Sequence, residues 1–193
     1  RDKTPALGHQ YKSQLTKATT AKDGQTYKKC TVCGAVTGKT VIAKASNIKL
    51  SKTAYTYNGK VQKPSVTVKD SKGKALKNGT DYKISYPKGM KNVGKYTVKV
   101  TLKGNYSGSK SMTYNINPKG TSVSKVKAAK KGFKVTWKKQ ATQTSGYQVQ
   151  YSTSSKFKKA KTVTISKNKT TSAYSPCIYS SNNAVGGHNR KNA

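Results

Sequence analysis

The chain has 193 residues, which is long enough for one large domain or for two or three small β modules, and 32% of its residues are hydrophobic. It carries 40 Lys and Arg residues against four Asp and no Glu, which gives a formal net charge of +36. Four scattered carboxylates nearly exclude acid/base catalysis by a carboxylate pair. Only Arg1 and Arg190 are arginines, and lysine lacks the planar guanidinium that recognises bases, so specific nucleic-acid recognition is disfavoured. The apolar residues are mainly Val, Ile and Tyr, which favours strands, and we predict an all-β protein.

Residues 1–44 are predicted to form a small β module that contains a CxxC hairpin. Cys30-Thr-Val-Cys33-Gly34 has the spacing with which two thiolates bind one metal ion, and it lies between Tyr27 and Val36. His9 is a candidate third ligand. A structural zinc site usually has four protein ligands, so we predict no bound metal and no cofactor, with Cys30 and Cys33 as free thiols or a simple redox pair. No βαβ pattern accompanies the cysteines, which disfavours thioredoxin-like catalysis.

Residues 45–118 show short alternating segments separated by turn residues, the pattern of a β-sandwich. The longest alternation runs from Tyr96 to Leu102, with Thr or Lys between the apolar residues. Segments such as Asn58-Gly59 supply the positive φ angles that tight hairpins require. We predict an independent antiparallel sandwich with the lysines outside and an interior of Val66, Val68, Tyr82, Ile84, Tyr96, Val98, Val100, Tyr114 and Ile116.

The alternation stops at Asn117-Pro118-Lys119-Gly120, which predicts a linker. Residues 119–174 are predicted to form a second, partial sandwich. Residues 175–193 are predicted to be a polar tail, because they carry Pro176 and Gly186-Gly187 where two alternating strands would complete the sandwich. An incomplete sandwich would leave an open sheet edge, through which the chain could self-associate. The apolar alternation of the second sandwich is carried by Phe133, Val135, Trp137, Tyr147, Val149, Tyr151, Val163 and Ile165.

Three tyrosines are candidate ligand-binding residues. Tyr55, Tyr57 and Tyr106 lie near turns, where an exposed aromatic side chain beside Lys can contact a ligand. The other tyrosines in the alternating segments are predicted to belong to the cores, because they occupy the apolar faces of strands: Tyr82, Tyr86, Tyr96, Tyr114, Tyr147 and Tyr151.

No catalytic residue is predicted, and we expect the chain not to be an enzyme. A nucleophile such as Cys177 would need His9 or His188 as its base, and the two histidines stand near opposite polar ends of the chain. No apolar run approaches the roughly 20 residues of a membrane span. The first residues contain no signal-peptide core, and the chain begins with Arg1, so we expect a processed protein or a fragment without a transmembrane segment.

The segment from Leu50 to Asn117 resembles an immunoglobulin-like repeat of clostridial surface and secreted proteins, through LSKTAYTYNGKVQKPSVTVKD, GTDYKISYP, NVGKYTVKVTLKGNYSGS and INP. GFKVTWKK and SGYQVQYSTSSKFKKAKTVTI resemble the first strands of bacterial fibronectin type III modules, in which the Trp137 position packs in the core. That resemblance ends after Ser172. The N-terminal cysteine segment resembles a small module that often accompanies these repeats, in which a further Cys commonly stands near Thr19 or Thr20; this chain has no Cys there.

The resemblance implies a non-catalytic structural or adhesive module of a Gram-positive bacterium, acting as a spacer or a ligand-presenting repeat in the extracellular space or on the cell surface. Its partner would be a surface glycan or a protein. The alternative is a Lys-rich electrostatic binder of acidic polymers, namely nucleic acid, teichoic acid or an acidic glycan. Such binding would be independent of sequence and would weaken steeply with salt. The two functions are compatible in one chain.

Overall fold

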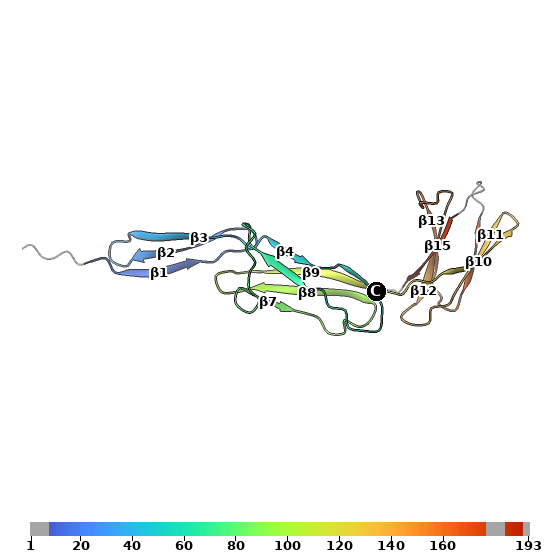
Figure 1. Cartoon of the computed structure of the whole chain (residues 1–193), viewed down its shortest axis with the longest axis horizontal. Helices are drawn as coiled ribbons and strands as arrows, with labels where there is room; N and C mark the ends of the chain where they lie inside the picture. Colours follow the sequence, from blue (N-terminus) through green and yellow to red (C-terminus); the bar gives the residue numbers. More distant parts are fainter. Residues whose placement is uncertain (1–7, 177–183, 191–193) are drawn as a thin grey trace, which may run out of the picture. The chain divides into compact units, whose positions relative to one another are not determined.

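The computed structural model describes residues 8–176 and 184–190 (Figure 1). Within these ranges the chain forms β-strands and turns and contains no helix, so the predicted all-β class is confirmed. Accordingly, the described residues contain no helix that is long and apolar enough to cross a membrane. Backbone contacts divide the chain into two compact units: Arg1–Thr53, Pro64–Lys88 and Thr97–Thr113 form unit 1, and Ala54–Lys63, Gly89–Tyr96 and Tyr114–Ala193 form unit 2.

Unit 1 begins with a three-stranded antiparallel sheet in the order β1 (Tyr11–Thr16), β2 (Gly24–Cys30), β3 (Val36–Ile42). Every side chain of β1 is exposed, and in β3 only Ile42 is partly covered. Gly24 is required at the start of β2, because a Cβ atom there would lie 2.3 Å from the backbone of Thr16 and Ala18. The sheet is joined to the rest of unit 1 at Ala18, whose N–H donates to the Asn105 carbonyl oxygen at 3.0 Å.

The middle of the chain forms two sheets. One pairs β4 (Asn47–Leu50) with β6 (Val66–Lys69), and the other has the order β5 (Ala54–Thr56), β9 (Ser109–Asn117), β8 (Gly94–Leu102), β7 (Tyr82–Ser85). The pairs β4–β6 and β7–β8 are antiparallel as predicted, whereas the short strand β5 pairs with β9 in parallel. The core of unit 1 consists of Ala18, Ala45, Ile48, Val68, Leu76, Tyr82, Val100, Leu102 and Tyr106.

The predicted side-chain register in this region is confirmed. Lys83 and Lys99 are exposed, while Val98 and Val100, which flank Lys99 on β8, are fully buried. The predicted interior residues Val68, Tyr82, Tyr114 and Ile116 are also buried, and Val66, Ile84 and Tyr96 are half-buried.

The C-terminal part of unit 2 contains two three-stranded sheets. Their orders are β10 (Val123–Ala129), β11 (Gly132–Trp137), β14 (Ser172–Pro176) and β13 (Lys161–Ile165), β12 (Gly146–Ser152), β15 (Ala184–Arg190). The inner residues of β11 and β12 form one core: Phe133, Val135, Trp137, Tyr147, Val149 and Tyr151. Trp137 lies against Tyr147 with ring centroids 5.3 Å apart.

Strand β15 corrects the expectation of a polar tail after residue 174. Ala184–Arg190 pair antiparallel with all seven residues of β12, and Gly186 and Gly187 lie opposite Gln150 and Val149. The tail was expected to lack strands because it has no apolar alternation, but backbone pairing requires only free N–H and C=O groups on the partner strand. In this sheet β12 is therefore the central strand, between β13 and β15. Residues 177–183 and 191–193 of the expected tail lie outside the described residues.

Candidate functional site

His9, Cys30 and Cys33 form a compact group of metal-binding atoms. One ligand atom from each residue lies within 4.8 Å of the others, and His9 Nδ1 lies 3.1 Å from Cys33 Sγ. Cys30 is buried, whereas His9 and Cys33 are exposed, and both cysteines are free thiols. Among the side chains that the structure describes, no other His, Cys, Asp or Glu joins this group. His9, which the sequence offered as a candidate third ligand, thus lies beside the CxxC motif.

The sheet register explains how three residues so far apart in sequence meet. Tyr11 of β1 lies opposite Cys30 of β2, so the chain just before β1 runs past the turn that follows Cys30. This extension is fixed by the Thr31 N–H, which donates to the Gln10 carbonyl oxygen at 2.8 Å. His9 then packs its ring against Tyr11, with centroids 5.4 Å apart, on the side of the turn that carries Cys33.

The turn itself shapes the environment of the Cys30 sulfur. The Gly34 N–H donates to the Cys30 carbonyl oxygen at 3.1 Å, and Gly34 has a positive φ of 77° that suits glycine. The backbone N–H groups of Cys33 and then Val32 hydrogen-bond to the Cys30 sulfur and, with weaker help from His9 and the Cys33 side chain, lower the pKa of Cys30 to about 6, although burial opposes the shift. The thiolate is thus favoured at Cys30.

Of the three candidate tyrosines, Tyr106 is not available to a ligand. Its side chain is 7% exposed and belongs to the core of unit 1, and the following residue, Ser107, donates its N–H to the Ala18 carbonyl oxygen at 2.8 Å. The expectation of an exposed ring is wrong here, because the loop around Tyr106 receives the segment at Ala18. Sequence alternation does not reveal this long-range contact. Burial, and then the charges of Asp81 and Asp70, raise the pKa of Tyr106.

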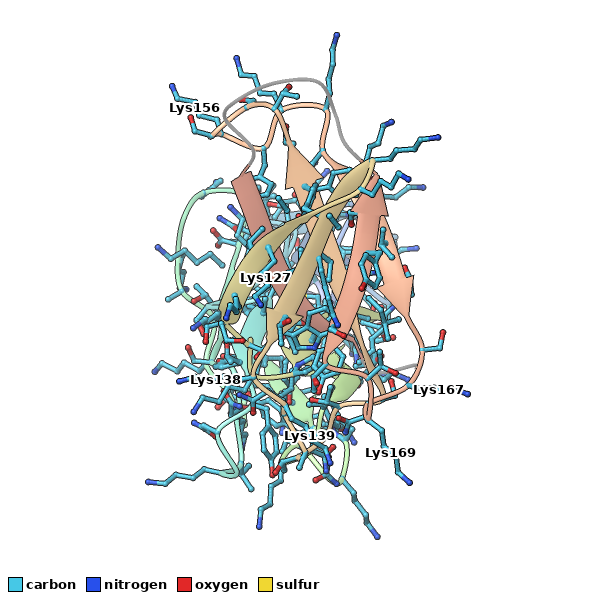
Figure 2. The ribbon with its side chains drawn as sticks, turned by 90° about the vertical axis from the view of Figure 1, so that its right-hand side faces the viewer. Lys127, Lys138, Lys139, Lys156, Lys167 and Lys169 are labelled. Carbon is cyan, nitrogen blue, oxygen red and sulfur yellow. The ribbon has the colours of Figure 1, made fainter. Side chains whose placement is uncertain are left out.

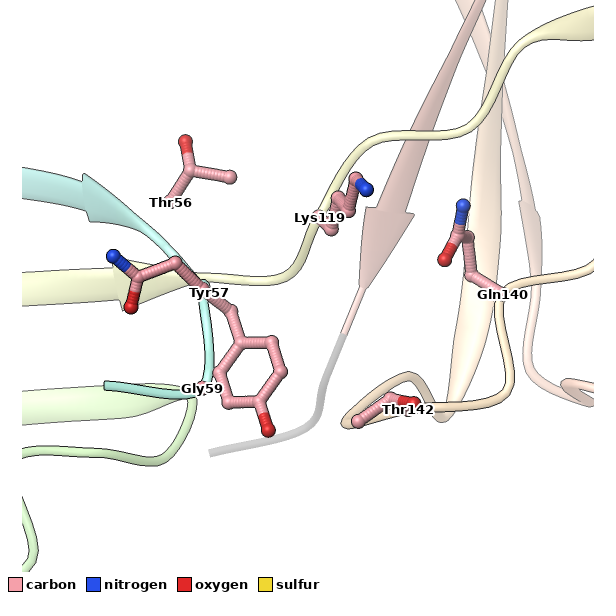
Figure 3. Close-up of a pocket in the computed structure, with 7 residues that line it drawn as sticks. Thr56, Tyr57, Gly59, Lys119, Gln140 and Thr142 are labelled. Atoms are coloured by element: carbon pink, nitrogen blue, oxygen red, sulfur yellow. The ribbon is translucent and has the colours of Figure 1, made fainter.

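Tyr55 and Tyr57 are both half-buried and differ in their surroundings. Tyr55 packs edge-on against Tyr114, with ring centroids 5.7 Å apart, so it supports unit 2. Tyr57 lines an open cavity of about 590 Å³ (Figure 3). The other lining residues are neutral or basic, with no carboxylate, imidazole or thiol among them: Thr56, Asn58, Gly59, Lys119, Gln140 and Thr142. Through its described lining residues the cavity therefore offers an aromatic ring beside hydroxyl and amide groups.

Sequence reasoning missed Tyr174 of β14, a large aromatic side chain with 69% of its surface accessible. The sheet register places it beside Lys134 of β11, whose Nζ lies 5.4 Å from the centre of the Tyr174 ring. Lys127 of β10 lies opposite Lys134 on its other side. These three residues, here named the Tyr174 row, cross the sheet β10-β11-β14. The signal was weak in sequence because Tyr174 stands in a short Ser- and Thr-rich segment.

The lysines of this region project into solvent, and those labelled in Figure 2 are all exposed. From Tyr82 to the end of the chain the sequence contains no Asp or Glu. The three aspartates that the structure describes accept hydrogen bonds from backbone N–H groups: Asp23 from Lys44, Asp70 from Lys72 and Lys74, and Asp81 from Lys77. The few carboxylates of this chain therefore serve turns, and the cationic surface of unit 2 has no carboxylate of its own. Cys177 lies outside the described residues, as does the side chain of His188.

No protein-family model and no curated protein matches this sequence.

Proposed function

We propose that this protein is a non-catalytic extracellular or cell-surface protein of structural or adhesive function, in which an immunoglobulin-like and a fibronectin type III-like sandwich follow each other in the chain. The observation that carries the proposal is the presence of two separate hydrophobic cores, each formed by strands whose outward positions are largely Lys, Ser and Thr. Modules with independent cores are suited to spacing and presentation, because each can resist unfolding alone.

The strand orders support this assignment. The facing sheets β10-β11-β14 and β13-β12-β15 have the arrangement expected for the first six strands of a fibronectin type III sandwich, in which consecutive strands are distributed between two sheets. The N-terminal β1-β2-β3 sheet would be the small cysteine-bearing module of such proteins. A Gram-positive surface location follows from the resemblance of the repeats and is part of the same proposal.

The adhesive form of the proposal assigns the ligand to the cavity at Tyr57. An aromatic ring surrounded by hydroxyl and amide groups suits a neutral sugar, whose apolar face stacks on the ring while its hydroxyls accept and donate hydrogen bonds. Such binding is hardly screened by ions. The test is an array of neutral glycans probed with the full chain at low and high salt, beside Tyr57→Ala and the control Tyr174→Ala.

Salt-resistant binding to one glycan that is lost in Tyr57→Ala and kept in Tyr174→Ala would support an adhesive site at the cavity. Retention of binding in Tyr57→Ala would contradict that site. For the spacer form, stretching the full chain in a force spectrometer should give at least two separate unfolding events, one for each core. A single unfolding event would contradict the proposal of independent modules.

A second function, binding of acidic polymers, is favoured by the Tyr174 row. Two lysines on adjacent strands repel each other, and a bound anion would relieve this repulsion while a sugar or base stacks on Tyr174. Lysine contacts to duplex DNA give a slope of log affinity against log salt of about −0.9 for each phosphate neutralised. Replacing Lys127 and Lys134 by Ala should therefore reduce this slope by about 2.

The matched control is the replacement of Lys167 and Lys169 by Ala, which removes the same charge from the loop between β13 and β14, outside the Tyr174 row. If both double variants reduce the affinity for heparin or duplex DNA equally, the binding is a property of net charge and the Tyr174 row has no special role. A larger loss in the Lys127/Lys134 variant, together with a loss in Tyr174→Ala, supports the row as the site.

A further inference from the structure

We propose that His9, Cys30 and Cys33 bind one Zn²⁺ ion, or a comparably thiophilic divalent metal ion, and leave its fourth coordination position open to water or to an external ligand. The inference is independent of the adhesive and polyanion proposals, because it concerns the sheet β1-β2-β3 alone. It differs from the sequence expectation of no metal, which was based on the number of ligands and not on their arrangement in space.

The distances between the three ligand atoms suit a tetrahedral site. Zn–S bonds of about 2.3 Å and Zn–N bonds of about 2.0 Å, at tetrahedral angles, place ligand atoms about 3.5–3.8 Å apart. The three atoms here already lie within 4.8 Å of one another, and His9 Nδ1 and Cys33 Sγ are 3.1 Å apart. Changes of less than about 1 Å, which exposed side chains such as His9 and Cys33 make by rotation, would produce the metal geometry.

The backbone around the site is arranged for sulfur ligation. The N–H groups of Val32 and Cys33 point at the Cys30 sulfur, so they would hold a coordinating thiolate in place as outer-shell donors do in metal sites. The Cys30 N–H donates to the Ala35 carbonyl oxygen at 2.8 Å and closes the turn that presents both sulfurs on one side. The turn therefore needs no rearrangement of its backbone to present the two cysteines.

The described side chains of the sheet β1-β2-β3 bury little apolar surface. Leu15, Val36 and Val41 are 44%, 55% and 53% exposed, so the sheet has almost no core of its own. Small modules without a sufficient core generally need a disulfide, a metal or a partner. At its other end the sheet is fixed by the hydrogen bonds of Ala18 with the Tyr106 loop. A metal ion would fix the free end by joining His9 to Cys33, which stands 24 residues further along the chain.

The competing state of the two cysteines is a disulfide between Cys30 and Cys33. Such a bond would close only the short CxxC turn and would add no link to His9 or β1, so it would not stabilise the sheet as a metal would. It would also remove both sulfur ligands. The redox state of the cysteines therefore decides between a disulfide and a metal site. The experiment is done on reduced protein, in which both thiols are available to the metal.

The test is a titration of the reduced, metal-free full chain with Co²⁺, whose tetrahedral thiolate complexes absorb visible light, followed by displacement with Zn²⁺. The background variant is Cys177→Ser, which removes the third thiol of the chain. We expect one Co²⁺ per chain, and we expect Cys33→Ser or His9→Ala to weaken binding by more than about tenfold, since even outer-shell partners contribute that much. The matched control, His188→Ala, removes the other histidine and should leave binding unchanged.

Absence of a visible Co²⁺ spectrum, or a spectrum that Cys33→Ser leaves unaltered, would overturn the proposed site. Amide hydrogen exchange distinguishes coordination by His9 and the cysteines from nonspecific metal binding. Zn²⁺ should slow the exchange in β1, and a chelator should reverse the effect. Added imidazole or a small thiol should then shift the Co²⁺ spectrum, because the fourth position is open. If neither ligand shifts it, the position is occupied by a protein group and the open-site part of the proposal is wrong.

Discussion

The hydroxyl of Tyr147 donates a hydrogen bond to the side-chain oxygen of Asn168 at 2.9 Å, in the core region formed by β11 and β12. The same hydroxyl accepts the Gln140 N–H at 3.1 Å, and the Asn168 Nδ2 group donates to the Thr144 carbonyl oxygen at 2.7 Å. One buried tyrosine thus connects the loop before β12 to the loop after β13. These connections have no signature in the strand alternation, because all but Tyr147 lie in loops.

Tyr147→Phe should destabilise this part of unit 2 by about 1–3 kcal/mol, because it leaves the buried partners of the hydroxyl without a hydrogen bond while the ring still fills its place. Trp137 is the only tryptophan of the chain, is 3% exposed and lies against Tyr147, so its fluorescence reports on this region alone. Urea unfolding followed at Trp137 measures the change. Tyr174→Phe, at an exposed position, is the control and should change the stability by less than about 0.5 kcal/mol.

The alternation of the middle segment was sufficient to predict which faces of its strands are buried. A one-residue error would have exposed Val98 and buried Lys99, and the structure has the opposite arrangement. Contacts over long sequence distances were not predictable in the same way. Tyr106 is buried only because Ala18 pairs beside it, and β15 forms only because β12 offers an unpaired edge. Both depend on neighbours that a local pattern does not specify.

The candidate site was predictable in its residue types and not in its arrangement. The CxxC spacing identified Cys30 and Cys33, and His9 was the only histidine in the same module. That His9 reaches Cys33 depends on the register that sets Tyr11 opposite Cys30. A register shifted by one residue would have turned His9 to the other face of the sheet. Tyr174 was missed for the related reason that its lysine neighbours come from other strands.

Asp70 should be the most important carboxylate for stability. Its side chain is 6% exposed, and it accepts the N–H groups of Lys72 and Lys74, both at 2.9 Å, in the turn after β6. Asp70→Ala should lower the free energy of unfolding of unit 1 by about 2–3 kcal/mol, because two backbone donors lose a charged acceptor. Asp23→Ala is the comparison, because Asp23 accepts a single backbone N–H, from Lys44.

The measurement for Asp70 is amide hydrogen exchange of the full chain, which resolves the unfolding of β4 and β6 from that of unit 2. Asp70→Asn keeps one acceptor oxygen without the charge and should be intermediate between the native residue and Ala. An Asp70→Ala variant as stable as the native chain would show that the turn finds its hydrogen bonds in water and that the buried carboxylate has no stabilising role.

Tyr106 should make unit 1 sensitive to alkali. Burial and the nearby charges of Asp81 and Asp70 raise its pKa, so the folded state holds the phenol proton more tightly than the unfolded chain does. The stabilisation is complete below the unfolded value of about 10 and is lost as the pH rises through the higher folded pKa. Stability should therefore fall above about pH 10 in the native chain and less steeply in Tyr106→Phe.

The alkaline experiment compares the two proteins at each pH, so that contributions common to both cancel in the difference. Parallel stability curves for the native chain and Tyr106→Phe would contradict the raised pKa.

Lys131 offers a test of backbone conformation that needs no ligand. It lies with Lys130 in the two-residue connection between β10 and β11, where Ala129 pairs with Gly132, and its φ is +60°. A side chain in this left-handed region costs about 1–2 kcal/mol, which glycine avoids. Lys131→Gly should thus raise the free energy of unfolding, followed by Trp137 fluorescence, by about 1 kcal/mol.

Lys130→Gly is the matched control, since it removes the same charge at a neighbouring position whose φ is not positive. Glycine there only adds freedom to the unfolded chain and should cost about 0.5–1 kcal/mol. Opposite signs for the two variants would assign the effect to the backbone of Lys131. A stabilisation of similar size in both would assign it instead to the relief of charge repulsion at the hairpin.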